Sequence, residues 1–373
     1  MGTPVRCEAV IELSAVRRNV TAIRAALGPA VAVLAVVKAD GYGHGAVQVA
    51  RAALDAGAEM LGVATLAEAV ALRQAGLTAP LVGWLWVPGE DPGPALSAGV
   101  QVGVSSLPQL DAVLASAGAD RPRIHLKIDT GLGRGGAAGS DIAPLLRAAA
   151  TAAAAGRVEV AGLMSHLASA DVPGDESVPE QIATFDAVCR RATDAGLRPA
   201  VRHLANTAGA LAHPGTRLDM VRIGIGLYGL SPVHDGPALR PAMTLRATVA
   251  LTKRVPAGHG VSYGLTYRTS AETTLALVPI GYADGVPRAA SNAAEVSIGG
   301  RRLRIAGRVA MDQFVVDCGN QQVRAGDQVL LFGPGDDGEP TATDWADACD
   351  TIDYEIVTRI GPRTPRRYLE GRD

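Results

Sequence analysis

The feature that most constrains the fold is a repeated alternation between short apolar runs and longer, alanine-rich amphipathic stretches. The apolar runs are strand candidates at 32–37, 59–64, 80–85, 100–104, 122–128, 158–164, 199–204 and 219–223. Runs that are apolar throughout are typical of parallel strands buried on both faces. Eight such strands separated by helical segments predict an α/β fold with an N-terminal (β/α)8 barrel of the TIM type. The first helix is expected from Ser14 to Leu27, with Ser14 as its N-cap.

The pattern changes near residue 242. Residues 244–255 alternate between apolar and polar side chains, as a half-exposed strand does. Further strands are predicted at 273–279, 295–298, 301–306, 313–317 and 327–332, with a Gly299-Gly300 hairpin turn and a helical piece at 343–358. We therefore expect two domains, a barrel over residues 1–242 and a mostly β-strand domain over residues 243–373.

Charge and cysteine usage exclude several classes of function. The 35 basic and 37 acidic residues nearly cancel, and no basic cluster is interleaved with aromatic residues as a nucleic-acid surface requires. No apolar stretch has the length of a membrane span and the first residues lack the apolar segment of a signal peptide, so we expect a cytoplasmic protein without membrane partners. The four cysteines form no Cys-x-x-Cys pair, which argues against a disulfide framework and against a metal site.

The first barrel strand ends in a lysine. The run Val31–Val37 is followed by Lys38 and then by Ala-Asp-Gly-Tyr-Gly-His-Gly45. Catalytic residues of (β/α) barrels gather at the C-terminal ends of the strands. A lone lysine there is also consistent with a side chain that only reaches into solvent. The polar residues Asp40, Tyr42 and His44, separated by glycines that let a ligand approach the backbone, favour a functional role.

Two basic residues lie on or beyond the fifth strand. Its alternation places His125, Lys127 and Asp129 on one face, and if that face lines the barrel, burial disfavours the charged form of Lys127. Arg134, just beyond the strand, has the planar guanidinium that suits a carboxylate ligand. A structural salt bridge between these cations and Asp129 explains the pattern equally well.

The last three strands bring further polar groups to the same barrel mouth. His166 and His203 each lie at the C-terminal end of a strand, and Asn206 and Thr207 begin a short helix. Arg222 is followed by Ile-Gly-Ile-Gly-Leu-Tyr-Gly229, where glycines expose backbone donors to a ligand. A lysine, an arginine and a phosphate cradle at one mouth together indicate pyridoxal phosphate (PLP) as the cofactor.

Six motifs resemble alanine racemase in order and spacing: Val-Val-Lys38-Ala-Asp-Gly-Tyr-Gly-His-Gly, Asp-Thr-Gly-Leu-Gly-Arg134, Ser-His166-Leu-Ala-Ser-Ala-Asp171, Gly-Val-Ser-Tyr263-Gly, Ile-Gly-Tyr282-Ala-Asp-Gly and Arg308-Val-Ala-Met311-Asp312-Gln. The resemblance spans both expected domains. It departs at Thr207, where many members have serine, at Ile223, where proline is common, and at Ala310, where cysteine is frequent. None of these changes removes a chemical group that the reaction needs, although Ile223 bears on the fine geometry of the phosphate site.

The resemblance implies a homodimeric PLP enzyme with shared active sites that interconverts L-alanine and D-alanine and supplies D-alanine for peptidoglycan. Lys38 matches the lysine that binds the cofactor covalently and acts as one base, and Tyr263 matches the second base, supplied by the other subunit. Racemisation needs two bases on opposite faces, because one removes the α-proton while the other delivers one. His166 matches a residue that hydrogen-bonds the base tyrosine, and His203 and Arg222 extend that network to the cofactor.

Other roles follow from the same resemblance. Arg222 matches the partner of the cofactor's ring nitrogen, where an arginine keeps the nitrogen unprotonated and limits side reactions. Arg134 matches the ligand of the substrate carboxylate, and Lys127 matches a lysine carbamylated by carbon dioxide. The remaining matches are cofactor ligands (Tyr42, Asn206, Thr207, Gly224, Ile225, Tyr354), partner-supplied substrate-pocket residues (Tyr282, Met311, Asp312) and a substrate access corridor (Asp171, Arg288, Arg308), whose charges are equally consistent with solvated side chains.

Three alternatives remain at this stage. A racemase of broader or different specificity, such as serine, would carry the same residues. A barrel-fold PLP decarboxylase of basic amino acids would lack the Gly-Val-Ser-Tyr263 motif and usually has an acid at the position of Arg222. A non-catalytic PLP-binding homeostasis protein is a single barrel, so the strands after residue 242 argue against it.

Overall fold

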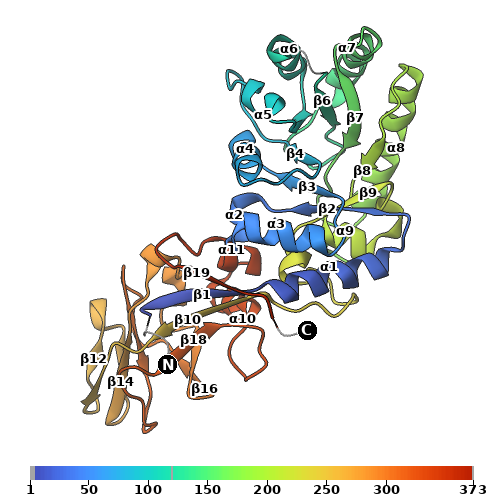
Figure 1. Ribbon diagram of the computed structural model, residues 1–373. Helices are drawn as coiled ribbons and strands as arrows, with labels where there is room; N and C mark the ends of the chain where they lie inside the picture. The colour runs from blue at the N-terminus through green and yellow to red at the C-terminus, as the bar shows by residue number, and fades with distance from the viewer. Residues whose placement is uncertain (1–4, 119–120, 372–373) are drawn as a thin grey trace. The chain divides into compact units, whose positions relative to one another are not determined.

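The computed structural model describes residues 5–118 and 121–371 and divides into two compact units (Figure 1). One unit consists of residues 17–41 and 46–239, and we call it the barrel unit. The other combines residues up to 16, residues 42–45 and the chain from residue 240 onward, and we call it the β unit. No helix among the described residues has both the length and the apolar character that crossing a bilayer requires.

The barrel unit is built on eight parallel strands. They are β2 (Ala32–Val36), β3 (Met60–Val63), β4 (Leu81–Gly83), β5 (Gln101–Val104), β6 (Arg123–Lys127), β7 (Glu159–Met164), β8 (Val201–His203) and β9 (Met220–Ile223). Their order in the sheet is β8-β7-β6-β5-β4-β3-β2-β9. The two outermost strands also meet, because Arg222 N donates to Ala205 O at 3.0 Å and Asp219 N donates to Arg202 O at 3.2 Å. The prediction of an eight-stranded parallel barrel is therefore confirmed.

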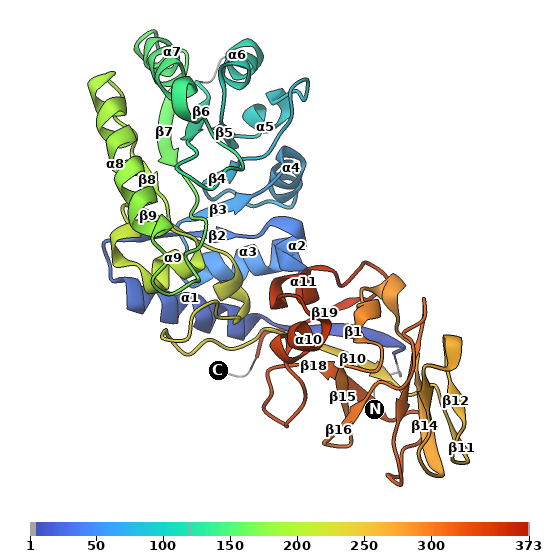
Figure 2. The ribbon, with the colours of Figure 1, turned by 180° about the vertical axis from the view of Figure 1, so that it is seen from behind.

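Helices surround these strands, as Figure 2 shows. They are α1 (Leu13–Leu27), α3 (Ala46–Asp55), α4 (Leu66–Gln74), α5 (Gly93–Ser97), α6 (Leu107–Ser116), α7 (Ile142–Ala154), α8 (Ser177–Asp194) and α9 (Thr207–Ala212), with short 3-10 helices at Gly139–Asp141, Pro214–Thr216 and η3 (Ile225–Tyr228). α7 turns Leu145, Ala149 and Ala152 inward at helical spacing. The first helix begins one residue earlier than expected, and Ser14 is not its cap, because its hydroxyl donates to Glu12 Oε1 at 2.8 Å.

The β unit contains a six-stranded sheet, a three-stranded sheet and a two-stranded ribbon. The large sheet has the order β16 (Arg301–Arg304), β15 (Glu295–Ile298), β18 (Gln328–Phe332), β10 (Met243–Thr248), β1 (Cys7–Glu12), β19 (Arg366–Leu369). The smaller sheets are β11 (Leu251–Val255), β14 (Thr273–Val278), β17 (Phe314–Asp317) and β12 (Gly260–Val261) with β13 (Tyr267–Arg268). The helices of this unit are α10 (Ala342–Cys349), α11 (Asp353–Thr358), η4 (Tyr263–Leu265), η5 (Tyr282–Asp284) and η6 (Arg288–Ala290).

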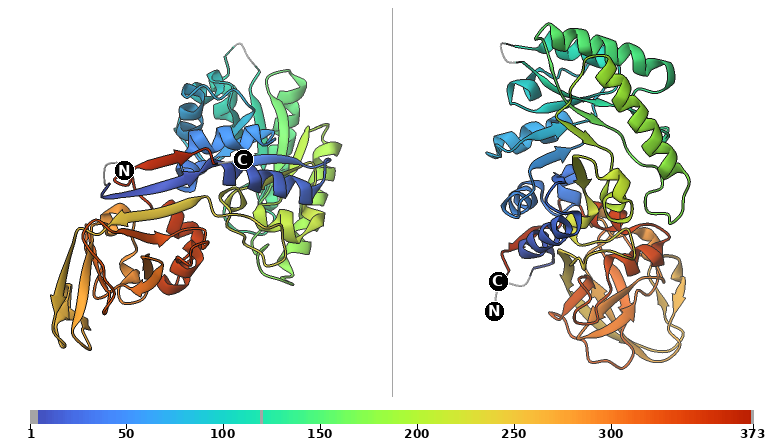
Figure 3. Two further views of the ribbon diagram at one scale, coloured as in Figure 1. Left: turned by 60° about the horizontal axis from the view of Figure 1, so that its bottom comes forward. Right: turned by 90° about the vertical axis from the view of Figure 1, so that its right-hand side faces the viewer.

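The start of the chain differs from the expected division at residue 242. β1 pairs antiparallel with β10 and parallel with β19, and Figure 3 (left) shows β1 and β19 side by side. The alternating residues Cys7, Ala9 and Ile11 are buried in this sheet, and Glu8 accepts hydrogen bonds from Arg246 of β10. The first strand therefore belongs with the β unit and not with the barrel, which differs from the expected barrel over residues 1–242.

Candidate active site

The backbone directly after β2 forms a left-handed turn. In α2 (Lys38–Tyr42), the φ angles of Ala39 and Asp40 are both 52° and that of Gly41 is 60°, which makes a left-handed turn directly after Lys38. For residues other than glycine, this conformation costs roughly 1–2 kcal/mol each. Such strain persists only where the surrounding structure holds it, and it is commonly found at functional sites.

Three hydrogen bonds hold the left-handed turn. Gly41 N donates to Val37 O at 2.9 Å, and Asp40 Oδ1 accepts from the N–H of Ala46 at 2.9 Å. Glu68 Oε1 accepts from Ala39 N at 2.7 Å. The other oxygen of Glu68 closes the capping box of α4, so this carboxylate joins the loops that follow β2 and β3. Lys38 is thereby fixed at the C-terminal end of β2.

Two lysines of the barrel unit are in surroundings that disfavour their charge. Burial lowers the pKa of Lys38 most, and the cation of Arg134 lowers it further. Burial is also the largest cause that lowers the pKa of Lys127, followed by Arg134 and Arg222. Both amines are therefore shifted toward the neutral form in which an amine acts as a nucleophile or a base.

Asp129 builds the loop that carries Arg134. Its carboxylate accepts from the backbone N–H groups of Gly131 at 2.9 Å, Gly133 at 3.2 Å and Arg134 at 2.8 Å. Burial alone would raise the pKa of Asp129, but these bonds outweigh it and hold the pKa below its usual value. The salt-bridge alternative of the sequence analysis is thus replaced, in the described part of the chain, by a carboxylate that binds backbone amides.

Arg222 is the centre of the polar groups at the barrel mouth. Its Nη1 donates to His203 O at 2.8 Å and faces His203 Nδ1 at 3.3 Å. Its Nη2 donates to Ser165 O at 2.6 Å and Leu204 O at 2.9 Å, and faces His166 Nδ1 at 3.2 Å. Burial lowers the pKa of Arg222 to about 10, so it stays a cation near neutral pH. None of these five contacts uses Nε, which leaves that donor for a ligand.

Thr207 joins the loops that follow β8 and β9. Its hydroxyl accepts from Gly224 N at 3.1 Å and from Gly226 N at 3.5 Å. Asn206 is the N-cap of α9, where its Oδ1 accepts from Gly209 N at 2.9 Å, as the predicted helix start implied. Consecutive backbone N–H groups and a hydroxyl in a glycine-rich turn form a concavity suited to a phosphate. Ile225 is buried within this turn.

Three predicted residues of the β unit lie on segments that one buried carboxylate, Asp284, helps to hold together. Asp284, which is 0% exposed, accepts from Arg6 at 2.8 and 3.1 Å and from Gly281 N at 2.9 Å. Arg363 contacts Asp284 at 3.2 Å and donates to Asp312 at 2.6 Å. The backbone N–H groups of residues 282 and 283 donate to the carbonyls of residues 310 and 311 at 3.1 and 2.9 Å. The segments that carry Tyr282, Met311 and Asp312 are thus bonded to each other.

The predicted base of the β unit is a surface residue of the isolated chain. Tyr263 is 71% exposed at the start of η4, and the hydroxyl of Ser262 before it donates to Arg308 O at 2.6 Å. Tyr282 and Met311 are 41% and 53% exposed. Tyr263, Tyr282 and Met311 are thus among the large side chains that the single chain leaves exposed.

The other predicted residues are distributed between the two units. Tyr42 and Tyr354 belong to the β unit, with ring centroids 6.3 Å apart, and burial raises the pKa of Tyr42 to about 12. Arg288 and Arg308 are exposed residues of the same unit, and Asp171 is an exposed residue of the barrel unit. Their membership of a common corridor stays a prediction.

Three residues that hold these segments in place were not predicted from the sequence: Glu68, Asp284 and Arg363. For Glu68 a signal existed, because Thr65-x-x-Glu68 is a capping-box pattern, but that pattern does not reveal the bond to Ala39 N. Asp284 and Arg363 depend on a partner distant in sequence, Arg6, which no local pattern indicates.

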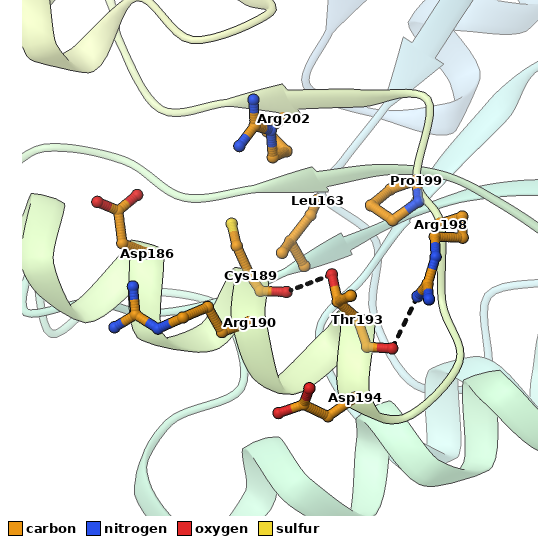
Figure 4. A pocket seen from close by; sticks show the side chains of 9 residues that line it. All are labelled: Leu163, Asp186, Cys189, Arg190, Thr193, Asp194, Arg198, Pro199 and Arg202. Atoms are coloured by element: carbon orange, nitrogen blue, oxygen red, sulfur yellow. Dashed lines mark hydrogen bonds between the residues drawn. The ribbon is translucent and has the colours of Figure 1, made fainter.

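A separate hollow of about 640 Å³ lies between α8 and strands β7 and β8 (Figure 4), lined by Leu163, Asp186, Cys189, Arg190, Thr193, Asp194, Arg198, Pro199 and Arg202. Arg202 is held by two bonds to Asp219 at 2.8 and 3.0 Å, and Arg198 donates to Thr193 O at 2.7 Å. Burial raises the pKa of Cys189 to about 11, so its thiol is a poor nucleophile near neutral pH. This hollow carries no set of groups comparable to the barrel mouth.

Comparison with known proteins gives a consistent result over the whole chain. Residues 11–232 match the family described as alanine racemase, N-terminal domain, and residues 242–368 match alanine racemase, C-terminal domain. Alanine racemase of Frankia casuarinae is 56% identical, over 99% of this chain and 97% of that protein, and the enzyme of Salinispora arenicola is 54% identical, over 97% and 98%.

Solved structures of alanine racemases have the same fold as this chain. The alanine racemase of D-cycloserine-producing Streptomyces lavendulae superposes with a TM-score of 0.96 at 51% identity, covering 99% of this chain and 98% of that one. The alanine racemase of Bacillus anthracis with bound L-Ala-P gives a TM-score of 0.91 at 36% identity, covering 99% and 96%.

Proposed function

The chain belongs to the alanine racemase family and is an isomerase that interconverts L-alanine and D-alanine, and we propose that it does so with PLP and two bases, Lys38 and Tyr263. The observation that carries this proposal is the group of Lys38, Arg222 and the Thr207 turn, each at the C-terminal end of a strand of one barrel. When bound at this site, PLP would supply an electron sink for the amino group and α-carbon of an amino acid, which makes the α-proton acidic.

The residues present fit that cofactor. Lys38 has a lowered pKa, as an amine that reacts with an aldehyde needs. Thr207, Gly224 and Ile225 would hold the phosphate. With Ile223 in place of a common proline, the turn is closed by the Thr207 hydroxyl, which accepts from Gly224 N and Gly226 N. Arg222 would face the ring nitrogen and, as a cation with a pKa of about 10, would donate to it without giving up a proton. Tyr42, Asn206, Ile225 and Tyr354 complete the proposed cofactor contacts.

Lys38 and Tyr263 move the protons. In one direction the oxygen of Tyr263 takes the α-proton from one face of the substrate, and Lys38, in its protonated form, delivers its proton to the other face and is left as the neutral amine. In the reverse direction the roles exchange. His166 supports the tyrosine: its Nδ1 faces the guanidinium of Arg222, so the proton of the neutral ring is on Nε2, where it can donate to a phenolate oxygen. Burial, with Arg222 as the next cause, lowers the pKa of His166 to about 3, which keeps that ring neutral.

The substrate would be held by Arg134 and limited in size by residues of the β unit. Arg134 would bind the carboxylate of alanine, and Met311, Tyr282 and Asp312 would line the space for the methyl group. We propose that Lys127 is carbamylated, because its lowered pKa favours the neutral amine that reacts with carbon dioxide, and the resulting anion would orient Arg134. Asp171, Arg288 and Arg308 would line the way in.

The exposed Tyr263 supports a homodimer with shared sites. A base that is 71% exposed in one chain needs a cover that excludes water, and a second copy that presents its barrel mouth would provide it. We further propose that the protein acts in the cytoplasm and supplies D-alanine for peptidoglycan. A racemase that also accepts serine carries the same residues, so a chiral assay that offers alanine beside serine defines the specificity.

Two variants test the cofactor and the bases separately. Lys38→Ala should lose the absorbance at about 420 nm of a lysine-bound cofactor together with all activity. Tyr263→Phe, which removes only a hydroxyl, should keep that absorbance and lose racemisation. Normal absorbance in Lys38→Ala would overturn the assignment of the cofactor lysine, and full activity in Tyr263→Phe would overturn the two-base scheme.

A further inference from the structure

A line of hydrogen-bonded side chains crosses the interior of the barrel, and the proposed chemistry uses only one end of it. Gln101 Oε1 lies 2.7 Å from His125 Nε2, His125 Nδ1 lies 2.8 Å from His203 Nε2, and His203 Nδ1 faces Arg222 Nη1 at 3.3 Å. Both imidazoles are 0% exposed, and Gln101 and Arg222 are 6% and 4% exposed. We call these four residues the interior chain.

Along the interior chain, each residue from Gln101 to His203 lies closer to the C-terminal ends of the barrel strands than the one before. Gln101 is the first residue of β5, and His125 pairs in register with Gly103, two residues further along. His125 is level with Gly162 of β7, which pairs with Val201, and His203 is two residues beyond that. The chain therefore connects the floor of the barrel to the arginine at its mouth.

The direction of every hydrogen bond in the interior chain follows from Arg222. A guanidinium only donates, so His203 Nδ1, which faces it, must accept. A neutral imidazole that accepts at Nδ1 has its proton on Nε2, so His203 Nε2–H donates to His125 Nδ1. By the same logic His125 Nε2–H donates to Gln101 Oε1. One set of tautomers thus satisfies every link, and Gln101 supplies the final acceptor.

The packing around His125 leaves its ring little room to turn. A Cβ atom placed on Gly162 would lie 2.2 Å from His125 Nδ1, so only glycine fits there. The rings of His125 and His203 meet edge to face, with centroids 5.0 Å apart and planes at 87°. Burial is also the main cause that lowers the pKa of His125 to about 3 and that of His203 well below its usual value, which agrees with two neutral rings.

We propose that Gln101 and His125 are positioning residues that fix the tautomer of His203 and thereby hold Arg222 in place. Without the Gln101 acceptor, the Nε2–H of His125 would be buried and unsatisfied. If both imidazoles changed tautomer to avoid this, the Nδ1–H of His203 would point at the guanidinium of Arg222, which cannot accept it. Arg222 would then lose one of its contacts and shift. The role toward the cofactor rests on the proposed function, whereas the tautomers themselves do not depend on a cofactor.

The first test reads the tautomers in the cofactor-free protein. Nitrogen NMR of selectively 15N-histidine-labelled protein at neutral pH should show His125 and His203 as neutral rings protonated on Nε2, with resonances assigned by the loss of one set in His125→Phe. A protonated ring, or a proton on Nδ1 of either residue, would overturn the proposal. This readout stands even if the protein binds no PLP.

The second test compares two substitutions of matched length. Gln101→Met removes the acceptor and should weaken PLP binding by about tenfold, while Gln101→Glu keeps an acceptor oxygen and should stay within about twofold of the parent protein. The NMR pattern of His203 should change in Gln101→Met alone. Equal PLP affinity and an unchanged His203 spectrum in Gln101→Met would refute a positioning role. Failure of the parent protein to bind PLP would instead contradict the proposed function.

Discussion

The carboxylate of Glu68 serves two loops at once. One oxygen accepts from Ala39 N in the left-handed turn, and the other accepts from Ala64 N and Thr65 N at the start of α4. The conformation of each loop therefore does not depend on its local sequence alone, because one carboxylate accepts hydrogen bonds from the backbone of both. The position of Lys38 therefore depends on a residue of the next barrel strand's loop.

Replacing that carboxylate should loosen the turn. Glu68→Gln retains one acceptor oxygen, but its amide nitrogen would meet a backbone N–H on one side, so we expect the free energy of unfolding to fall by about 1–3 kcal/mol. Urea denaturation measures this. Because the charge of Glu68 raises the pKa of Lys38, the variant should also have a still lower lysine pKa. Glu180→Gln, an exposed position on α8, is the control, and an equal loss in both variants would contradict the argument.

At this scale the sequence revealed which residue types matter more readily than how they are held. Lys38 and His166 lie just beyond strand ends and His203 and Arg222 lie in the last residues of strands, and strand ends are visible as the ends of apolar runs. The left-handed turn could not be predicted, since Ala39 and Asp40 are ordinary residues whose conformation is imposed by tertiary hydrogen bonds.

At the scale of elements, Asp284 links the start of the chain to two segments that we propose to line the substrate pocket. Burial raises its pKa, but the bonds from Arg6 and Gly281 N outweigh burial, so the pKa in the folded state is below the usual value. A carboxyl with a depressed folded pKa stabilises the protein fully above its unfolded pKa of about 3.9, and this stabilisation is lost as the pH falls through the folded value.

Asp284→Asn should therefore destabilise the protein most near neutral pH. We expect a loss of about 2 kcal/mol at pH 7, from two weakened charged hydrogen bonds, and a difference from the parent protein that shrinks below about pH 4. Urea unfolding at several pH values measures both. Asp111→Asn, an exposed carboxylate of α6, should change little, and a difference for Asp284→Asn that does not vary with pH would count against the assigned ion pairs.

Element boundaries were predictable where one apolar run corresponds to one strand. All eight barrel strands were located to within about two residues, because each is a buried apolar run. The prediction of a single strand over 244–255 is wrong, because this run forms two strands, β10 and β11, in different sheets. The alternation of apolar and polar residues continues through Val249-Ala250 and so does not reveal the break. β19, with the sequence Arg-Arg-Tyr-Leu, and the two-residue strands β12 and β13 lack any apolar signal of sufficient length.

At the scale of the whole molecule, the proposed shared site predicts recovery of activity from two inactive proteins. Lys38→Ala and Tyr263→Phe subunits, mixed in equal amounts, should form hybrids in which one of the two sites has both bases. Random pairing in a twofold dimer gives about a quarter of the parent activity. Subunit exchange has to be verified by mass spectrometry of differently tagged chains, and no recovery after verified exchange would refute a site shared between subunits.

The pairing of β1 with both β10 and β19 has a consequence for how the chain folds during synthesis. The eight barrel strands are complete once residue 223 has left the ribosome, so the barrel unit can close early. β1 is made first, yet its neighbours in the sheet are residues 243–248 and 366–369. β1, with its apolar residues, therefore stays unpaired through most of translation. Its contacts with β10 and β19 also join residues far apart in the sequence, and both features slow folding and favour aggregation. Chaperone dependence should accordingly concentrate on the β unit.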